Sequence, residues 1–300
     1  MPTALIGIDW GTTRLRGFRI GGEGALLERR ESALGISQIR EGAFDQALCA
    51  LIADWQPKRG STPILMCGMI GSRQGWKEAP YAHCPAGAAE IAAGMIEVRW
   101  GRGRRAWIAP GLTCRDATGV PDVMRGEEVQ ILGTLDRLAP TGTTWICLPG
   151  THSKWAKVEG GRIVEFATYM TGEVFAVMKA HSILGRMMAE AAVDLEAFDA
   201  GVRRAREPGG LLHHLFGVRT RGLFGDLTDD RSAAYLSGLM IGHEIASVPW
   251  LAGSVHILGA EQLGTLYVVA LRCFGIEASR LDADAAVGGL YRLARTLPNH

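Results

Sequence analysis

The chain has 300 residues, of which 47% are hydrophobic and 21% are charged, as expected for a globular protein with a large buried core. Its net charge of +1 excludes a general nucleic-acid binder and a surface strongly attracted to membranes. No apolar run approaches the ~20 residues of a membrane span, and we expect no export signal. The six cysteines form no C-x-x-C pair, so we expect reduced thiols and a cytoplasmic location.

The opening run Leu5–Thr13 (LIGIDWGTT) places a carboxylate and a Gly-Thr-Thr turn at the end of a buried strand. Residues 4–8 are apolar, and residues 14–20 alternate between charged and apolar types, which indicates two strands joined by a tight turn. Such a hairpin can offer N–H groups and hydroxyls to phosphate oxygens, while Asp9 holds Mg²⁺ directly or through water. An ordinary polar turn explains the run equally well when it is taken alone. Neither a Walker A loop nor a dinucleotide-binding fingerprint stands here.

Strands and helices alternate through the first half of the chain, which indicates an α/β domain. Further strands are expected at residues 25–32, 63–69 and 106–109, and a helix is expected at residues 42–55. The strand at 63–69 ends in a glycine-rich loop. Residues 122–133 predict a loop that enters a helix, with Glu127 and Glu128 in its first turn, where the helix dipole favours negative charge.

Residues 143–169 repeat the layout of the opening. A strand precedes Gly150-Thr151, and a Gly-Gly pair follows ten residues later, as one does after Gly11. This shared offset of 139 residues suggests two related domains with a nucleotide between them. Only the first hairpin carries a carboxylate, because Leu148 stands where the opening has Asp9.

The second half of the chain is mainly helical, with the clearest periodicity at residues 174–190 and 233–246. A strand at 255–258, a small turn at Gly259-Ala260 and a helix at 261–274 follow. Such a strand–turn–helix unit lets backbone N–H groups approach a nucleotide phosphate or ribose closely. A plain connecting turn is the alternative.

This ordered set of motifs resembles the sugar kinase, Hsp70 and actin ATPase superfamily. Within it, the chain is similar to the 2-dehydro-3-deoxygalactonokinase family. The strings that carry the resemblance span almost the whole chain and lie at residues 8–13, 68–72, 75–77, 79–81, 123–128, 148–155, 171–173, 181–185 and 236–242. The strings at 124–128 (MRGEE) and 149–155 (PGTHSKW) look family-specific, whereas Gly259-Ala260-Glu261 departs from the usual superfamily pattern.

The resemblance implies a two-domain, actin-like ATPase fold of the ribonuclease H-like α/β class, with the nucleotide cleft between the domains. We expect an N-terminal domain at residues 1–140 with the first phosphate hairpin and the sugar-acid site. A C-terminal domain at 141–281 would hold the second phosphate hairpin and the adenosine motif. A segment at 282–300 is expected to be helical and to pack back on the N-terminal domain.

The implied activity is that of a phosphotransferase with an alcohol group as acceptor. It uses ATP and Mg²⁺ to phosphorylate the C6 hydroxyl of 2-dehydro-3-deoxy-D-galactonate, which gives ADP and 2-dehydro-3-deoxy-6-phosphogalactonate in galactonate catabolism. The expected partner is this small sugar acid rather than nucleic acid or membrane, and the protein is expected to be a monomer or homodimer.

The resemblance also assigns roles to residues. The nucleotide and its phosphates are expected to contact Asp9, Gly11, Thr12, Thr13, Gly150, Thr151, His152, Lys154, Gly259 and Ala260, with Asp9 as the Mg²⁺ residue. In similar sugar kinases an acid that follows a glycine takes the acceptor proton, so Glu127 is the expected general base. Glu128 and Asp122 are the alternatives, and a purely dipole-stabilising role is another.

A sugar acid needs a cation or N–H donors for its carboxylate. The candidates in loops expected to border the site are Arg14, Ser72, Arg73, Trp76 and Lys77. For Arg73 and Lys77, a simple role as solvated loop charges is the alternative.

Two other functions fit the same motifs. A kinase for a different sugar or sugar acid would keep the fold and change the acceptor. An ATP-driven switch would use the hairpins without a small acceptor, although 300 residues leave little room for the added subdomains of such proteins.

Overall fold

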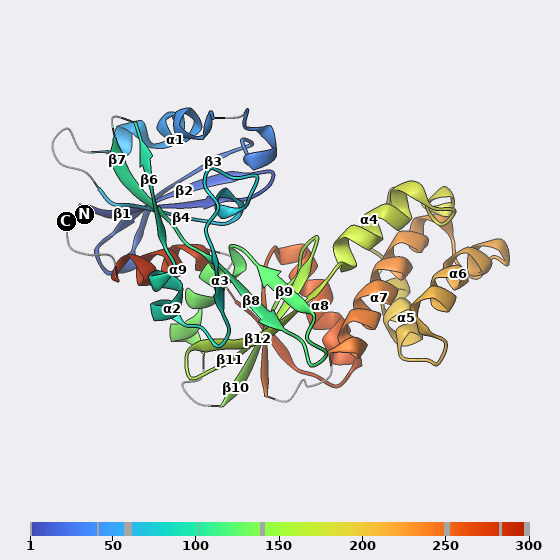
Figure 1. Cartoon of the computed structure of the whole chain (residues 1–300). Coiled ribbons are helices and arrows are strands. Elements are labelled where there is room, and N and C mark those ends of the chain that lie inside the picture. The colour runs from blue at the N-terminus through green and yellow to red at the C-terminus, as the bar shows by residue number, and fades with distance from the viewer. Residues whose placement is uncertain are drawn as a thin grey trace. The chain divides into compact units, whose positions relative to one another are not determined.

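The structure is a computed structural model that describes residues 2–40, 42–56, 62–101, 103–138, 142–248, 253–281 and 284–296. The chain separates into two compact units, which are described here one at a time (Figure 1). Unit 1 comprises Met1–Gly142, Val158–Phe166 and Ala283–His300, and unit 2 comprises Thr143–Lys157 and Ala167–Asp282. The expected domain boundary at residues 140 and 141 lies outside the described residues.

Unit 1 is built on a six-stranded sheet of order β3-β2-β1-β4-β7-β6. Its strands are β1 (Thr3–Trp10), β2 (Leu15–Gly21), β3 (Leu26–Ser32), β4 (Ile64–Cys67), β6 (Ile96–Trp100) and β7 (Arg104–Ile108). The pairs β1–β2 and β2–β3 are antiparallel, whereas β1–β4 and β4–β7 are parallel. The predicted opening meander is thus confirmed. Strand β4 ends two residues before its predicted end, because Gly68 turns the chain with a φ of +89°.

Helices cover both faces of this sheet. They are α1 (Phe44–Ile52), α2 (Ala88–Ala93), α3 (Glu127–Leu132) and α9 (Ala285–Ala294), with 3₁₀ turns η1 (Gly22–Gly24), η2 (Ile36–Gln38), η3 (Ala53–Trp55), η4 (Met69–Gly71) and η5 (Leu135–Arg137). Leu51 of α1 packs over Gly17 of β2, while Leu290 of α9 packs over Gly7 of β1 on the other face. The predicted helix at 42–55 is therefore a shorter α-helix followed by a 3₁₀ turn.

A small three-stranded sheet, β5-β8-β9, also belongs to unit 1. Its strands are β5 (Tyr81–His83), β8 (Gly111–Arg115) and β9 (Pro121–Met124). The sequence analysis did not predict it, since strands of three to five residues give little periodicity. The predicted loop at 122–126 is corrected accordingly, because Asp122 lies within β9 and pairs with Cys114 of β8.

Unit 2 contains most of a five-stranded sheet of order β12-β11-β10-β13-β14, whose segment Val158–Phe166, from the end of β11 into β12, is grouped with unit 1. Its strands are β10 (Thr143–Leu148), β11 (Ser153–Glu159), β12 (Arg162–Tyr169), β13 (Ser254–Leu258) and β14 (Ala278–Leu281). Strands β10, β13 and β14 run parallel, as β1, β4 and β7 do. The order of the five strands matches that of β3-β2-β1-β4-β7, so the layout inferred from the 139-residue offset recurs in the structure.

The helices of unit 2 are α4 (Thr171–His181), α5 (Leu195–Ala205), α6 (Gly210–Leu223), α7 (Asp229–Ser247) and α8 (Glu261–Cys273), with a 3₁₀ turn η6 (Gly185–Met187). Helix α4 ends well before its predicted end at residue 190. Ser182 there takes an extended conformation, and its hydroxyl accepts the N–H of Leu184 at 3.0 Å. In the described part of the chain, no helix is long and apolar enough to cross a membrane.

Glycines permit the closest helix contacts of both units. A Cβ on Gly238 of α7 would lie 1.9 Å from the carbonyl oxygen of Phe198 in α5, which locks these two helices together. In unit 1, a Cβ on Gly289 of α9 would lie 1.8 Å from the carbonyl oxygen of Val129 in α3. Helix α3 is therefore held by direct backbone contact with α9.

Replacing Gly289 by alanine is expected to lower the thermal unfolding midpoint by several degrees, because the added methyl group overlaps the Val129 carbonyl and costs about 1–3 kcal/mol of stability. Calorimetry of the variant and the parent measures this. Gly22→Ala is the matched control, since a Cβ there meets nothing within 4 Å. Equal midpoints for Gly289→Ala and the parent would contradict the packing described here.

Candidate functional site

Asp9 stands next to the last residue of β1 and is buried. Its Oδ2 accepts a hydrogen bond from Nη2 of Arg16, its partner across the hairpin, at 2.5 Å. Burial raises the pKa of Asp9 and the Arg16 charge opposes that rise. On its other side, a Cβ on Gly68 would lie 3.2 Å from Oδ1 and 2.8 Å from the Trp10 carbonyl oxygen, so only glycine fits at the end of β4.

The backbone at the tip of the first hairpin is hydrogen-bonded to neighbouring residues, and the side chains at the tip are exposed. The Gly11 N–H donates to the Arg14 carbonyl at 2.9 Å and closes the turn. Ser37 of η2 donates to the Thr12 carbonyl through its N–H at 3.1 Å and its hydroxyl at 2.8 Å. The side chains of Thr12 and Thr13 are exposed. The predicted phosphate-binding groups thus face solvent on a fixed backbone.

The acidic start of α3 lies against the end of β4. Gly126 has a φ of +110°, and a Cβ on it would lie 3.1 Å from the Cα of Gly68. This contact brings Glu127 and Glu128 close to the end of β1. Burial raises the pKa of the Cys67 thiol most, and negative charge on Asp9, Glu128 and Glu127 raises it further. The three acids therefore all lie near Cys67 at the end of β4.

The two glutamates differ sharply in their surroundings. Glu128 is fully buried, and its Oε2 accepts the Gly126 N–H at 2.7 Å. Burial, reinforced by the charge of Glu127, raises the pKa of Glu128 to about 8. Glu127 is partly exposed, and its Oε2 accepts the Arg125 N–H at 2.9 Å. Glu128 therefore holds a proton at neutral pH, and Glu127 is the acid that solvent reaches.

The third predicted acid is placed differently. Asp122 lies on β9 of the small sheet, where its Oδ1 accepts the N–H of Val123 at 2.7 Å. Its predicted place in the loop before α3 is wrong.

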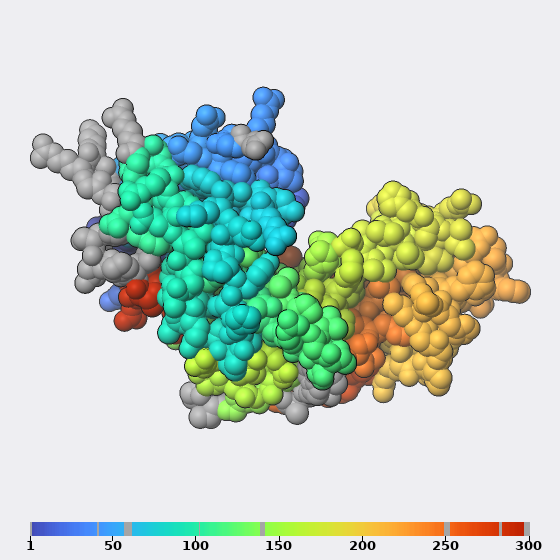
Figure 2. Space-filling model, in the orientation of Figure 1, coloured from blue at the N-terminus to red at the C-terminus, as the bar shows by residue number. Residues whose placement is uncertain are grey.

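The three predicted sugar-acid cations all have partners in unit 1. Arg14 pairs with Glu31 at 2.5 Å, Arg73 pairs with Glu78 at 3.1 Å, and the Lys77 ammonium donates to the Glu97 carbonyl at 3.0 Å. The loop that carries Arg73 and Lys77 is exposed and lies on the face of unit 1 seen in cyan in Figure 2. The ring of Trp76 stacks on that of Phe44, with centroids 6.3 Å apart.

Two buried side chains beside this loop have polar atoms with no hydrogen-bond partner in the described part of the chain. The Ser72 hydroxyl has no hydrogen-bond partner among the described residues. The Arg125 guanidinium, which the sequence analysis did not single out, donates from Nη2 to the Ala79 carbonyl at 2.9 Å and lies 4.3 Å from the Tyr81 ring centroid. Its Nε and Nη1 have no partner in the part of the chain that the structure describes. The MRGEE string was the signal that could have found it.

In unit 2, the second hairpin packs on the first turn of α4. A Cβ on Gly172 would lie 2.4 Å from the Gly150 carbonyl oxygen, and the Glu173 N–H donates to the Thr151 carbonyl at 2.9 Å. The side chain of His152 pairs with that of Glu173. The hairpin is therefore fixed to a helix N-terminus, where N–H groups and the dipole favour anions.

Lys154 and the Gly259-Ala260 turn flank this hairpin. Lys154 is buried within β11, and its ammonium donates to the Thr168 hydroxyl at 2.8 Å. Gly259 packs on Pro149, since a Cβ on Gly259 would lie 3.5 Å from the Pro149 carbonyl oxygen. The turn after β13 thus lies beside the second hairpin.

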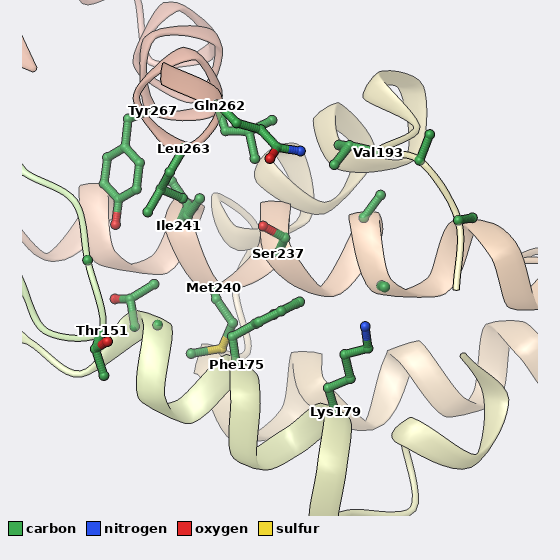
Figure 3. Close-up of a pocket in the computed structure, with 18 of the residues that line it drawn as sticks. Thr151, Phe175, Lys179, Val193, Ser237, Met240, Ile241, Gln262, Leu263 and Tyr267 are labelled. Atoms are coloured by element: carbon green, nitrogen blue, oxygen red, sulfur yellow. The ribbon is translucent and has the colours of Figure 1, made fainter. Parts of the chain in front are cut away.

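A cavity of about 460 Å³ opens next to the second hairpin, between α4, α7 and α8 (Figure 3). Its lining includes Gly150, Thr151, Thr171, Gly172, Phe175, Lys179, Ala233, Ala234, Ser237, Met240, Ile241, Gln262, Leu263, Leu266 and Tyr267. The walls are mainly apolar, and their polar groups include Lys179, Asp230, Ser237 and Gln262. The sequence analysis missed this cavity, although its α7 positions recur at helical spacing and mark one face.

A buried carboxylate underlies the cavity. Glu244 of α7 accepts hydrogen bonds from Trp155 Nε1 and from the Tyr267 hydroxyl, each at 2.8 Å. The Tyr267 hydroxyl also meets the Ser153 hydroxyl at 2.7 Å. Burial raises the pKa of Glu244, while the hydrogen bonds it accepts, that from Thr171 foremost, oppose the rise. This network ties the cavity wall to β11, the strand that follows the hairpin.

Comparison with known proteins identifies the family. The sequence profile of 2-keto-3-deoxy-galactonokinase matches residues 9–293. The chain belongs to the 2-keto-3-deoxy-galactonokinase family. The resemblance drawn from the sequence is thereby confirmed, and the profile spans all the hairpins, loops and helices described above.

Two sequence relatives match this family member over nearly their full length. A Rhizobium meliloti protein that carries the name 2-dehydro-3-deoxygalactonokinase DgoK1 is 41% identical over 298 residues, covering 97% of this chain and 96% of its own. The 2-dehydro-3-deoxygalactonokinase of Escherichia coli is 33% identical over 303 residues and matches along the whole of both chains.

Solved structures agree. A crystal structure assigned to a Sinorhizobium meliloti 2-dehydro-3-deoxygalactonokinase has a TM-score of 0.88 and 39% identity, covering 97% of this chain and 98% of that one. The Clostridium difficile activator of 2-hydroxyisocaproyl-CoA dehydratase, solved with bound ADPNP, has a TM-score of 0.51 and 12% identity, covering 97% and 94%. The second likeness extends to the fold alone. The chain has the actin-like ATPase fold of mixed α/β class that the sequence analysis expected.

In this 2-keto-3-deoxy-galactonokinase family member, Glu128 is expected to make stability fall as pH rises. A glutamate of ordinary pKa 4.5 ionises in the unfolded chain well before the folded one, whose pKa is about 8, so the unfolded state gains stability between these values. Glu128→Gln removes this effect. Urea unfolding of parent and variant at several pH values should show their stability difference changing by a few kcal/mol across this window. Parallel pH profiles would contradict the buried, protonated state.

Proposed function

We propose that this protein is an ATP-dependent kinase that transfers a phosphoryl group to the C6 hydroxyl of 2-dehydro-3-deoxy-D-galactonate, a step in galactonate catabolism. The relatives of 41% and 33% identity carry the name of this activity. The observation that carries the proposal is the meeting of three elements in unit 1. Buried Asp9, the exposed Gly-Thr-Thr tip and partly exposed Glu127 gather where β1, β4 and α3 come together.

Asp9 is the residue that would hold Mg²⁺. In the described residues no three His, Cys, Asp or Glu side chains form a metal cluster, but Mg²⁺ commonly uses one or two carboxylates together with phosphates and waters. Asp9 can act as such a carboxylate ligand. Arg16 donates a hydrogen bond to its Oδ2, and its Oδ1 lies beside Gly68, which has no side chain. When bound, Mg²⁺ supplies charge neutralisation to the phosphates.

Glu127 is the proposed general base. Phosphoryl transfer needs an acceptor oxygen that is positioned and relieved of its proton. The Arg125 N–H fixes one carboxylate oxygen of Glu127, and the side chain is partly open to solvent. Its neighbour Glu128 is protonated at neutral pH and shielded, which leaves Glu127 as the better candidate.

The nucleotide would use the cavity of unit 2. Apolar walls with a few polar groups are typical of small-molecule sites, and Ser237 and Gln262 supply donors and acceptors for a base. Gly150, Thr151 and the first turn of the 11-residue α4 would receive phosphates, with His152, Lys154, Gly259 and Ala260 in support. The C. difficile protein of related fold was solved with bound ADPNP, which supports nucleotide binding by this fold.

The acceptor acid is proposed to lie by the loop at residues 69–81 and the first hairpin, with Arg14, Ser72, Arg73, Trp76 and Lys77 as its candidate contacts. A kinase for another sugar acid remains the second candidate, and a panel of keto-deoxy acids and aldonates assayed for ADP release separates the two. We propose a cytoplasmic monomer or homodimer, consistent with six cysteines that are all free thiols.

Glu127→Gln is expected to cut kcat by ~10²–10⁴, since the amide cannot accept the acceptor proton. Nucleotide affinity, measured by calorimetric titration, should change little. Glu23→Gln is the control, because Glu23 is exposed on the turn between β2 and β3. Near-parental turnover of Glu127→Gln would remove this residue from the mechanism.

Ser237→Phe is expected to fill part of the 460 Å³ cavity and to raise the KM for ATP at least ~10-fold, while the KM for the acid stays close to the parental value. Steady-state kinetics with each substrate varied in turn measure both constants. Gly217→Phe adds the same ring on α6, where a Cβ meets nothing within 4 Å, and should leave both constants unchanged. An unaltered KM for ATP in Ser237→Phe would place the nucleotide elsewhere.

A further inference from the structure

Arg125 is a buried cation whose bonding capacity is largely unused. Its residue surface is 9% exposed. A guanidinium has five N–H donors and keeps its charge at every physiological pH. Here its Nη2 donates a hydrogen bond to the Ala79 carbonyl, and the guanidinium stacks on the Tyr81 ring. Nε and Nη1, whose N–H groups point in different directions, have no partner among the residues described.

The neighbouring acids do not fill this gap. Glu127 and Glu128 lie two and three residues after Arg125, but their Oε2 atoms accept the backbone N–H groups of Arg125 and Gly126. Glu128 is protonated at neutral pH, so it offers the guanidinium no full negative charge. A buried cation without an anion is costly. An acidic ligand that completes the pair would recover that cost on binding.

The surroundings of Arg125 are those of the proposed acceptor site. Its Nη1 packs against Gly71, since a Cβ on Gly71 would lie 2.9 Å from that atom. The next residue, Ser72, has a buried hydroxyl that also lacks a partner within the described part of the chain. Two residues beyond Arg125 lies Glu127, the proposed base. Unpartnered donors of two kinds thus adjoin the loop expected to bind the sugar acid.

We propose that Arg125 determines acceptor specificity by binding the carboxylate of the sugar acid through the unpartnered Nη1, with the Ser72 hydroxyl as a second donor. A hydrogen bond from a charged guanidinium to a carboxylate is roughly twice as strong as one between neutral groups. The inference rests on the proposed function, because it names the group that selects an acid over a neutral sugar at the same site.

Tyr81 packs on Arg125. Its ring lies over the guanidinium and is 37% exposed, whereas Arg125 is 9% exposed. It belongs to the three-residue strand β5, next to exposed Pro80. The ring covers a face of the guanidinium, whereas the N–H groups lie in its plane.

The test compares two acceptors on the same enzyme. One is 2-dehydro-3-deoxy-D-galactonate, and the other is the 3-deoxy-2-ketohexose of the same configuration, in which a hydroxymethyl group replaces the carboxylate. Arg125→Met should lower kcat/KM for the acid ~10–100-fold, mainly through KM, as expected for loss of a charge-assisted hydrogen bond. The much slower reaction with the neutral ketose should change less than ~3-fold. Arg125→Lys, which keeps the charge without the fork, should fall between.

Arg115→Met is the matched control, since Arg115 is exposed at the end of β8 in the same unit. Equal losses on both acceptors in Arg125→Met and Arg125→Lys would overturn the proposal and make Arg125 a support for the loop. Unchanged kinetics with the acid would overturn it as well. If Arg125→Met does not fold, the acid-to-ketose ratio of Arg125→Lys decides alone. Failure of the proposed function is distinct, because the parent enzyme itself would then phosphorylate neither acceptor.

Discussion

The contact between the backbones of Gly68 and Gly126 is the constraint on which the unit 1 site depends. Both residues have positive φ, and a side chain on either would strike the other segment or the end of β1. Because neither carries a Cβ, the ends of β1 and β4 and the start of α3 converge within a few ångströms. Asp9 and Glu127 lie near each other because these two glycines are in contact. Helix α9 fixes the position of α3 through its contact at Gly289.

The two hairpins, alike in strand order, are supported by different means. The first places a buried carboxylate at its base and balances it with Arg16 across the pair. The second has Leu148 at the equivalent position and packs instead on α4, above the hydrogen-bonded Glu244. The repeated architecture therefore holds a buried carboxylate in one copy and a cavity in the other. Two copies of one strand arrangement can carry different sites, because the packed core fixes the strand order while the residues of the turns can differ.

The sequence predicted the features that depend on local pattern. The hairpin at Asp9, its echo at Gly150-Thr151 and most long strands and helices follow from periodicity and glycine spacing. The sequence could not reveal which of two adjacent glutamates is buried, because helix α3 is too short to show a clear apolar face. Sequence also could not reveal the cavity beside α7, or that Nε and Nη1 of Arg125 have no partner among the described residues. Both features arise from packing between segments that are distant in the chain. Asp122 was misplaced because four-residue strands leave almost no periodic signal.

The protonation of Glu128 alters the charge that a substrate meets in unit 1. Counted by residue type, three acids gather around Cys67, namely Asp9, Glu127 and Glu128, while the charges of Arg16 and Arg29 act on Asp9. With Glu128 neutral, two carboxylates face two guanidinium groups. Two anionic reactants can then approach without working against a surplus of negative charge, and the carboxyl group that looks redundant in the sequence contributes bulk and hydrogen bonding in place of charge.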